Sequence, residues 1–527
     1  MDAKLKKMVG QMLMAGFPST EVDEQAVRLL EDYDVGNYIY FSRNMKSAEQ
    51  VARLSKDLSD RVYRRLGICP FISADQEGGA VSRITEGAAL MPGAMAVAAA
   101  TDGSSERSLA RMQKLGENCG QILRSVGVNL NLAPDMDVNI EPANPVIGAR
   151  SYGDDPEQVA TKAIAMMHGL EAGGVLPVIK HFPGHGNVSS DSHLGMPVNE
   201  TDRERLEKTE FAVFQKGIQA GAKAVMTAHV RYTQVDPDHP ATLSKVILTD
   251  MLRGQFHFDG LVMTDCLEMD AIRAAYGSGE GAVRAIEAGV DLLTVSHTYE
   301  ALSEVAEAIY QALDSGRLSE ERIQLSYDRI MKQKTEMGLL EPQVIDETTS
   351  EKTAMAADKL MLCREIAADS MTLLSGSAKL DLEHPDFLVI APDSRASTGA
   401  EDMKGVSFAD RAAARFGCLA AKIPLDGDST AAGMMLQSAV KMGFKKVILG
   451  LFNARLREGQ VKVLRELEDM PGVHLTVALL GAPYDCRLVQ RADGIVCAYE
   501  YTALSVEALL DALSAGEFPG VCPVKTE

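Results

Sequence analysis

The stretch GLVMTDCLEMDAI, residues 260–272, decides the fold class: an apolar run ends in a carboxylate, and a helix-like pattern follows. Asp265 closes that run. Six similar apolar runs alternate with longer helix-like segments over the first two thirds of the chain: 37–41, 70–75, 128–134, 177–182, 224–230 and 291–295. Strands that alternate with helices predict a parallel sheet, because each crossover returns the chain to the same edge.

Seven or eight such units within residues 1–340 fit a (β/α)8, TIM-like barrel better than an open sheet. Polar side chains stand where the apolar runs end: Asp75, Lys180, His181, His229 and Asp265. In a barrel the carboxyl ends of all strands meet at one mouth, where catalytic groups collect. We therefore expect these five side chains to share one site.

The composition changes after residue 337, where Pro342 and an acidic, Ser/Thr-rich patch are typical of a linker. A second set of apolar runs follows at 387–392, 445–452, 474–480 and 494–499. The prediction is an α/β chain in three parts. A catalytic barrel domain spans 1–340, a linker and connecting helix span 341–375, and a smaller α/β domain with a parallel sheet spans 376–527.

Bulk properties exclude several classes of partner. The formal net charge of −21 argues against nucleic acid or an anionic membrane, since both require clustered Lys and Arg. The eight cysteines are scattered with no C-x-x-C pair, which favours reduced thiols. No run reaches the roughly 18 apolar residues of a membrane span, and Leu5, Met8, Met12 and Leu13 fit an amphipathic helix better than a signal peptide. We expect a cytoplasmic protein.

The segment KHFPGHGNVSSDSH, residues 180–193, holds three of the ten histidines. A zinc site is one interpretation, but there is no H-E-x-x-H and no cysteine pair, and the glycines at 184 and 186 disfavour a helical ligand face. Proton transfer is the other. Asp191 lies two residues before His193, and a carboxylate there can hold one ring nitrogen and leave the other free to exchange a proton. We favour proton transfer and predict no metal and no cofactor.

Eight segments, in order and at sensible spacings, resemble glycoside hydrolase family 3, in the two-domain form of its β-N-acetylglucosaminidase branch. They are QMLMAGF, DQEGG, NLAPDMDVN, NPVIGARSYGDDP, KHFPGHG with DSH, VMTAHV, PATLS and FDGLVMTDCLEMDAI. The resemblance covers the first domain nearly end to end. It implies a retaining, exo-acting enzyme that releases terminal β-linked N-acetylglucosamine (GlcNAc) through a covalent glycosyl-enzyme.

The resemblance also implies roles for single residues. Asp265 matches the family's nucleophile, and His193, held by Asp191, matches the acid and base of this branch. The substrate-binding residues expected to grip the sugar are Asp75, Arg83, Arg150, Lys180 and His181, and we add His229 from its place at a strand end. Two positions depart from the family pattern: Ala80 stands where Arg is frequent, and Cys266 where a second Asp is common. We expect modest effects on rate or subsite preference.

Elementary chemistry agrees with these roles. Retaining hydrolysis needs a nucleophile on one side of the sugar ring and a proton donor at the leaving oxygen, and an imidazole with an ordinary pKa of about 6.5 suits proton exchange near neutral pH. The expected partner is a small GlcNAc-containing glycoside, and a homodimer is possible.

Four alternatives stay open. The first is transfer to phosphate, which a neutral imidazole does not repel, and the second is a β-glucosidase specificity. The third is substrate-assisted catalysis through DMDVNIE, residues 135–141, which has Asn139 where an acid belongs. The fourth is a non-catalytic sugar-binding protein, which would be expected to have lost Asp265 or His193. The natural leaving group, a muropeptide fragment, chitobiose or another glycoside of peptidoglycan turnover or similar metabolism, also stays open.

Overall fold

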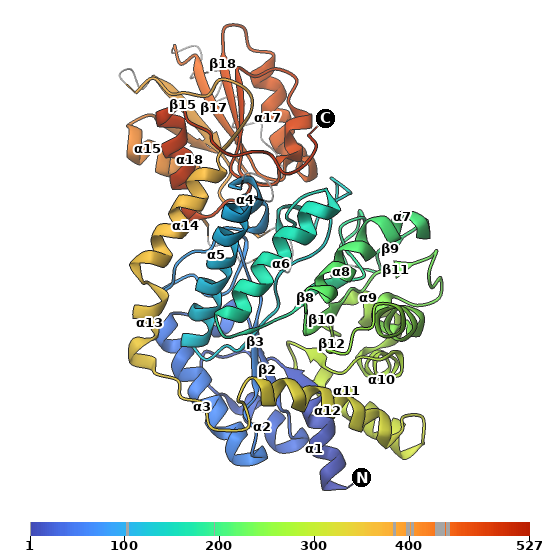
Figure 1. Ribbon diagram of the computed structural model, residues 1–527. Coiled ribbons are helices and arrows are strands. Elements are labelled where there is room, and N and C mark those ends of the chain that lie inside the picture. Colours follow the sequence, from blue (N-terminus) through green and yellow to red (C-terminus); the bar gives the residue numbers. More distant parts are fainter. Residues whose placement is uncertain are drawn as a thin grey trace.

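The computed structural model describes residues 2–101, 105–193, 195–382, 386–396, 401, 405–426, 438 and 443–526. The chain forms a large first domain and a smaller second domain that packs on one end of it (Figure 1). Helices α13 (Glu347–Ala354) and α14 (Ala357–Ser370) run along the side of the first domain and lead into the second. Among the described residues, no helix combines the length and the apolar character needed to span a bilayer.

Parallel strands form the centre of the first domain. Their bounds are β1 (Leu13–Ala15), β2 (Asn37–Tyr40), β3 (Phe71–Ala74), β6 (Leu130–Asn131), β7 (Leu176–Pro177), β8 (Ile179–Phe182), β10 (Ala224–Thr227), β12 (Leu261–Thr264) and β13 (Leu293–Val295). One sheet has the order β13-β1-β2-β3-β6-β7 and another the order β12-β10-β8. Val178 alone separates β7 from β8, and a parallel bridge from Met263 to Leu292 joins β12 to the start of β13. Eight strand positions therefore follow one another in a closed ring, in chain order.

Helices separate these strands and cover the outside of the ring (Figure 1). They are α1 (Ala3–Gln11), α2 (Glu24–Tyr33), α3 (Ala48–Leu66), α4 (Ala94–Ala99), α5 (Glu106–Ser125), α6 (Pro156–Ala172), α7 (Arg203–Lys208), α8 (Glu210–Gln219), the π-helix η4 (Val246–Gln255), α9 (Asp270–Tyr276), α10 (Ser278–Ala288), α11 (Tyr299–Asp314) and α12 (Glu320–Glu336). Their ends follow ordinary capping chemistry. Helix α3, for example, starts where Ser47 accepts the Gln50 N–H and stops at Gly67, whose φ is 73°.

The second domain holds one six-stranded sheet in the order β14-β19-β18-β17-β15-β16. Its strands are β14 (Thr372–Gly376), β15 (Phe387–Ala391), β16 (Leu419–Lys422), β17 (Lys446–Leu451), β18 (His474–Leu479) and β19 (Gly494–Cys497), flanked by α15 (Phe408–Phe416), α17 (Glu458–Glu468) and α18 (Ala503–Ala515). Every neighbouring pair is parallel except β14 with β19. The predicted fold class, an α/β barrel followed by a smaller α/β domain, is confirmed.

Within the barrel ring and the six-stranded sheet, three strands were not expected from the sequence. Strand β1 spans only three residues and follows α1 after a single residue, so Leu13, expected on a helix face, lies in the sheet. Strand β14 begins at Thr372, within the range predicted as linker. Three of the four residues of strand β16 are exposed, so its sequence contains no apolar run that would predict a strand.

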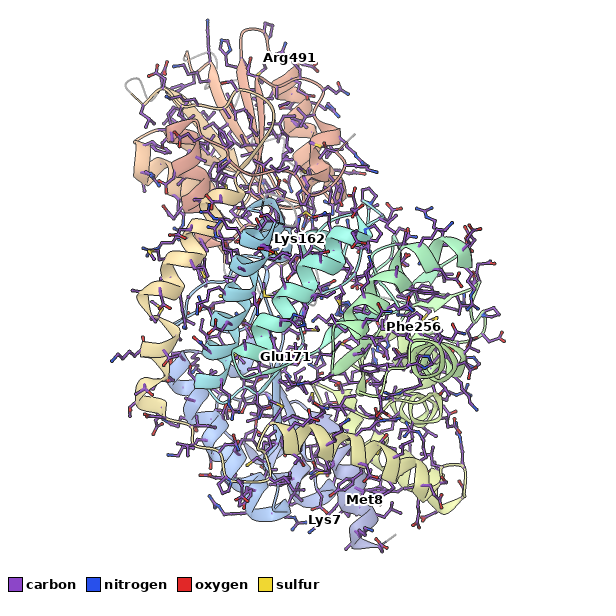
Figure 2. All side chains as sticks on the ribbon, in the orientation of Figure 1. Lys7, Met8, Lys162, Glu171, Phe256 and Arg491 are labelled. Carbon is purple, nitrogen blue, oxygen red and sulfur yellow. The ribbon has the colours of Figure 1, made fainter. Side chains whose placement is uncertain are left out.

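The two domains meet near α4 and α6. Lys162 of α6 lies near this border (Figure 2) and donates from Nζ to the Ala98 carbonyl at 3.4 Å. From the second domain, Glu500 accepts the Gly93 N–H at 2.6 Å and Arg455 Nε donates to the Pro142 carbonyl at 2.9 Å. These contacts bring the second domain against loops that follow barrel strands.

Candidate active site

A cavity of about 430 Å³ opens at the carboxyl ends of the barrel strands. Seven of the residues expected at the site line it: Asp75, Arg83, Arg150, Lys180, His181, His193 and Asp265. They come from β8, from the ends of β3 and β12, and from the loops that follow β5 (Val81–Ser82), β6 and β8. The fold thus brings together side chains that lie up to 190 positions apart in the sequence.

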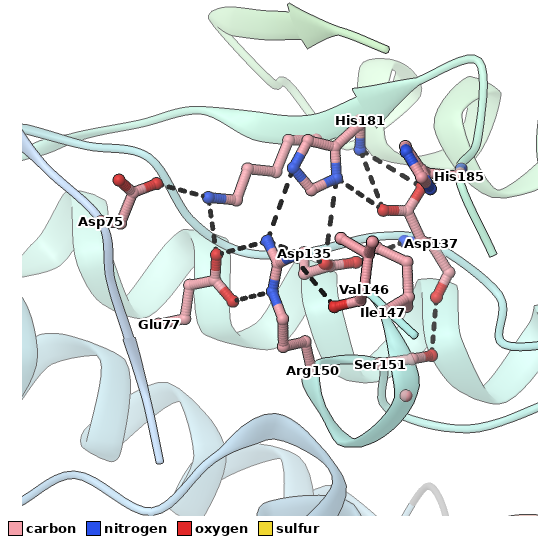
Figure 3. Close-up of polar contacts among 12 residues, drawn as sticks. Asp75, Glu77, Asp135, Asp137, Val146, Ile147, Arg150, Ser151, His181 and His185 are labelled. Carbon is pink, nitrogen blue, oxygen red and sulfur yellow. Dashed lines mark hydrogen bonds and ion pairs between the residues drawn. The ribbon is translucent and has the colours of Figure 1, made fainter. Parts of the chain in front are cut away.

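A network of buried ion pairs lies along one wall of this cavity (Figure 3). Lys180 Nζ lies 2.7 Å from Asp75 Oδ1 and 2.6 Å from Glu77 Oε1. Arg83 Nη2 lies 3.1 Å from Asp75 Oδ2. Arg150 binds Glu77 through two hydrogen bonds, Nε to Oε2 at 2.9 Å and Nη2 to Oε1 at 2.8 Å. Such a cross-linked network holds its donors and acceptors in fixed directions.

Charge in the network is set by these contacts. Burial raises the pKa of the Asp75 carboxyl, but the charges of Lys180 and Arg83 more than offset it and hold that pKa well below its usual range. Burial also opposes ionisation of Glu77, and Arg150 and Lys180 again prevail, lowering its pKa to about 2. Both carboxylates are therefore anionic at neutral pH and can accept hydrogen bonds from sugar hydroxyls.

Sequence reasoning missed Glu77. It lies in the short hairpin formed by β4 (Gln76–Gly78) and β5 (Val81–Ser82), inside the segment DQEGG. Its position between Asp75 and two glycines was the available signal. Its partner Arg150 lies 73 positions away in a loop, so the pair itself could not be inferred from spacing.

The second domain supports the loop that carries Arg150. Asn139 Nδ2 donates to Tyr484 Oη at 2.8 Å, and Asn139 Oδ1 accepts the Gly148 N–H at 3.1 Å. Arg455 binds the same loop through the Pro142 carbonyl. The guanidinium of Arg150 is thus positioned partly by residues outside the barrel.

His181 is held by a buried carboxylate. Its Nδ1 lies 2.7 Å from Asp137 Oδ2, and Asp137 also accepts the His185 main-chain N–H at 2.6 Å. Burial opposes ionisation of Asp137, but the charge of and bond to His181 lower its pKa to about 2. For the neighbouring Asp135, burial and the charge of Asp137 raise the pKa well above its ordinary value.

The proton-exchanging pair expected from the sequence is present. Asp191 Oδ1 lies 2.7 Å from His193 Nδ1 and accepts the His193 main-chain N–H at 2.8 Å. Burial lowers the pKa of His193, but the bond to Asp191 and the negative charge of Asp265 outweigh it and raise that pKa. With Nδ1 held by the carboxylate, Nε2 is the nitrogen left for exchange.

The loop that carries this pair is anchored although it is rich in Gly and Ser. Ser192 Oγ lies 3.1 Å from His185 Nε2, and the Ser192 carbonyl accepts the Ala271 N–H at the start of α9. That last bond measures 3.3 Å. The imidazole of His193 is thereby held on the cavity wall with 30% of its side chain exposed.

Asp265 follows β12 directly and its Oδ1 accepts the Cys266 N–H at 2.7 Å. Burial raises the pKa of this carboxyl, but three imidazoles, those of His229, His181 and His193, together reverse the effect and lower it. Asp265 is therefore an ionised carboxylate on the same cavity as His193. That is the pair of groups needed for attack on a carbon and for proton transfer to its leaving oxygen.

The structure does not bring His229 to the cavity wall. Its ring is buried, with Nδ1 2.7 Å from Thr242 Oγ1 and Nε2 3.0 Å from the Cys266 carbonyl. Both nitrogens are occupied, so the ring orients the segment that carries Asp265 and has no nitrogen left for a sugar. The position of His229 at a strand end suggested contact with the substrate, but both ring nitrogens already have partners in neighbouring loops.

Two groups of described side chains have the geometry to hold a cation: Asp135 with Asp137 and His181, and Cys266 with Glu268 and His297. In the first group a side chain already supplies the positive charge, because Nη2 of the Arg150 guanidinium lies 3.6 Å from Asp135 Oδ2. Its carboxylates are thus compensated by the ion-pair network.

Replacing Arg150 by Met is expected to lower the free energy of unfolding by about 3–5 kcal/mol, since it leaves the buried Glu77 carboxylate without its bidentate partner. Denaturant unfolding measures this loss, and Arg150→Lys should restore only part of it, because an ammonium cannot form the two-pronged bond. Arg61→Met, at an exposed pair with Asp57, is the matched control and should change little. Equal, small effects at both positions would contradict a structural role for the network.

A barrel with ionised groups gathered at its mouth has the architecture of an enzyme, and comparison with known proteins identifies the family. The model of the glycosyl hydrolase family 3 N terminal domain matches residues 4–333. The chain belongs to glycosyl hydrolase family 3, and the family resemblance found in its sequence is confirmed.

Among curated relatives, a β-hexosaminidase of Xylella fastidiosa (strain 9a5c) is 37% identical over 56% of this chain and 87% of its own length. A β-hexosaminidase A of Pseudoalteromonas piscicida is 31% identical over 63% of this chain, and the match spans 61% of that relative. Among solved structures, a family 3 β-N-acetylglucosaminidase from Paenibacillus sp. str. FPU-7 is 35% identical with a TM-score of 0.92, and the match covers 99% of each chain. A β-glucoside phosphorylase, BglX, shares the fold at 23% identity with a TM-score of 0.81, and the match covers 100% of this chain and 94% of that one.

Proposed function

We propose that the chain is a retaining β-N-acetylglucosaminidase that releases terminal GlcNAc from β-glycosides. One observation carries the proposal: the Asp191–His193 pair and the Asp265 carboxylate lie on the same cavity, close enough for Asp265 to raise the pKa of His193. The similar proteins named above, β-hexosaminidases and a β-N-acetylglucosaminidase, support this substrate class.

In the first half-reaction a carboxylate oxygen of Asp265 attacks C1 of the sugar, and the bond from C1 to the glycosidic oxygen breaks. His193 donates its Nε2 proton to the departing oxygen. The products are the free alcohol and a covalent ester between C1 and Asp265. In the second half-reaction neutral His193 takes a proton from water, the resulting oxygen attacks C1, and Asp265 leaves as a carboxylate. Two inversions at C1 give net retention.

Asp191 serves both halves. Its carboxylate fixes the tautomer of His193 and stabilises the imidazolium that donates in the first step and re-forms in the second. The raised pKa of His193 keeps a larger fraction of the ring protonated near neutral pH, which favours a proton donor. An imidazole here takes the place that a second carboxylic acid holds in most retaining glycosidases.

The ion-pair network is the proposed sugar-binding wall. Asp75 accepts hydrogen bonds from ring hydroxyls, while Lys180, Arg83 and Arg150 donate to hydroxyl oxygens, and His181 contributes its Nε2. These groups are bound to one another before substrate arrives, so little side-chain entropy is lost on binding.

Turnover of an aryl N-acetyl-β-glucosaminide and of the matching aryl β-glucoside, each with and without inorganic phosphate, tests the function. We expect the N-acetylated substrate to be preferred and the product to be free GlcNAc in both buffers. Preference for the glucoside would replace the proposed specificity. Phosphate-dependent formation of a sugar 1-phosphate would make the protein a phosphorylase, which an imidazole proton carrier also permits because a neutral ring does not repel the anion.

A further inference from the structure

Three different metal-ligating side chains converge at the edge of the catalytic cavity, away from the ion-pair network. The Cys266 thiol, a Glu268 carboxylate oxygen and a ring nitrogen of His297 all lie within 4.8 Å of one another. Cys266 and Glu268 follow β12, and His297 follows β13, the next strand of the ring. Cys266 and His297 both line the cavity. The proposed mechanism uses none of the three.

Glu268 is fixed as a ligand would need to be. Its Oε2 accepts the His297 main-chain N–H at 2.7 Å, and its Oε1 accepts the N–H and the hydroxyl of Thr298 at 3.1 and 2.8 Å. The Cys266 Sγ lies 3.8 Å from Oε2 and directs its proton there. An incoming cation displaces the thiol proton, because the thiolate is the form that binds a metal.

The spacing suits a small tetrahedral cation. Ligand atoms around zinc, with bonds of about 2.0–2.3 Å, lie roughly 3.5 Å from one another. Side-chain rotations that move the three ligand atoms by about 1 Å bring them to that spacing. His297 packs its ring against Phe41 at a centroid distance of 5.3 Å, and its Nδ1 lies 3.3 Å from Arg43 Nη1. A cation displaces that Arg43 contact. The positive charge of Arg43 opposes binding, whereas Glu268, Asp265 and the thiolate favour it.

We propose that Cys266, Glu268 and His297 form a binding site for one Zn²⁺ or a similar soft divalent cation, and that the bound ion inhibits turnover. Thiolate, imidazole and carboxylate together are a ligand set that Zn²⁺ prefers over Mg²⁺ or Ca²⁺. On binding, the sulfur–hydrogen bond is replaced by a sulfur–metal bond and the proton passes to solvent, with no change of oxidation state. Cys266 follows Asp265 directly in the chain and lines the cavity that Asp265 and His193 also line, so the bound ion obstructs the sugar.

Metal binding is tested on the full chain after treatment with a chelator. Titration with ZnCl₂ in a calorimeter should give one ion per chain, and CdCl₂ should produce the ultraviolet charge-transfer band of a cadmium–thiolate bond. Cys266→Ser should remove that band, and both Cys266→Ser and His297→Gln should weaken Zn²⁺ binding at least tenfold. The matched control is Cys486→Ser, at a more exposed thiol of the second domain, which should keep both signals.

Thermal unfolding of each variant checks that the fold is intact. Cys266→Asp is a second variant at the same position, where the family commonly carries Asp. This variant should still bind Zn²⁺, though more weakly than the unmodified chain, and it should lose the cadmium–thiolate band. Unchanged Zn²⁺ binding in both Cys266 variants would overturn the proposed site. Loss of Zn²⁺ binding in His193→Gln alone would also overturn it, because it would place the ion at the Asp191–His193 pair.

The inhibitory part rests on the proposed function, whereas metal binding does not. Each variant is compared with its own metal-free rate on the aryl N-acetyl-β-glucosaminide. Saturating Zn²⁺ should slow the unmodified chain at least tenfold, EDTA should reverse this, and Cys266→Ser should need at least tenfold more Zn²⁺ for the same inhibition. Binding without inhibition would overturn the inhibitory role. A chain with no glycosidase activity would refute the proposed function and leave the binding titration interpretable.

Discussion

Asp265→Asn is expected to lower kcat for an aryl N-acetyl-β-glucosaminide by about 10⁴-fold or more, because the amide cannot form the covalent bond to C1 on which both half-reactions depend. KM should change far less, since the sugar-binding wall is intact. Steady-state kinetics with a chromogenic substrate measures both constants. Each variant is purified on its own unused column, so that traces of unmodified enzyme do not contribute activity.

Asp270→Asn is the matched control for this change. Asp270 lies five residues further on, in the first turn of α9, where it pairs with the exposed Arg273. We expect activity within about twofold of the unmodified chain, as for most surface substitutions. If Asp265→Asn retained more than a tenth of the activity while Asp270→Asn behaved as expected, Asp265 would not be the nucleophile.

Asp191→Asn is expected to lower kcat/KM by about 10²–10⁴-fold and to shift its dependence on pH. The acid form of His193 is required in the first step, so kcat/KM should fall as pH rises through the His193 pKa. Asp191 raises that pKa against the opposing effect of burial. Its removal should therefore move the alkaline limb of the profile to lower pH. Because the pKa of His193 is higher in the folded chain than in the unfolded one, protonation of His193 stabilises the fold at low pH, and this contribution is lost as pH rises through the folded-state pKa. In Asp191→Asn this contribution to the free energy of unfolding at low pH should be smaller.

Leaving-group dependence separates this role from a structural one. Glycosides whose leaving group is a poor one need the proton most, so Asp191→Asn and His193→Gln should lose more activity on an alkyl glycoside than on a nitrophenyl glycoside. His239→Gln, at a half-exposed ring bound to Asp236 and outside the cavity lining, is the control and should keep both rates. An unshifted pH profile together with equal losses on both substrates would show that the pair does not carry the proton.

Much of the barrel was predictable because most of its longer strands are continuous apolar runs. Strands β3, β8, β10 and β12 are four residues long and wholly buried, as the central strands of a parallel sheet must be. Strand β1 was not foreseen, since three apolar residues directly after a helix cannot be told from another helical turn. The edge strand β16 was missed because most of its side chains face solvent.

The site was predictable to the extent that its groups end strands. Asp75, Lys180 and Asp265 could be placed at one mouth from chain order alone. The raised pKa of Asp135 could not be predicted, because it depends on burial beside Asp137. Nor could the isolation of His229 from the cavity, which follows from bonds to Thr242 and to the Cys266 carbonyl across two loops.

The central claim is that Asp265 attacks C1 while His193, braced by Asp191, faces it across the sugar. Mass spectrometry of the chain, digested after brief reaction with a slow, fluorinated aryl N-acetylglucosaminide, tests this most directly. The account predicts one covalent sugar per chain, on the peptide that contains Asp265. A sugar attached to another residue, or turnover to the product of inverted configuration with no attached sugar, would contradict it.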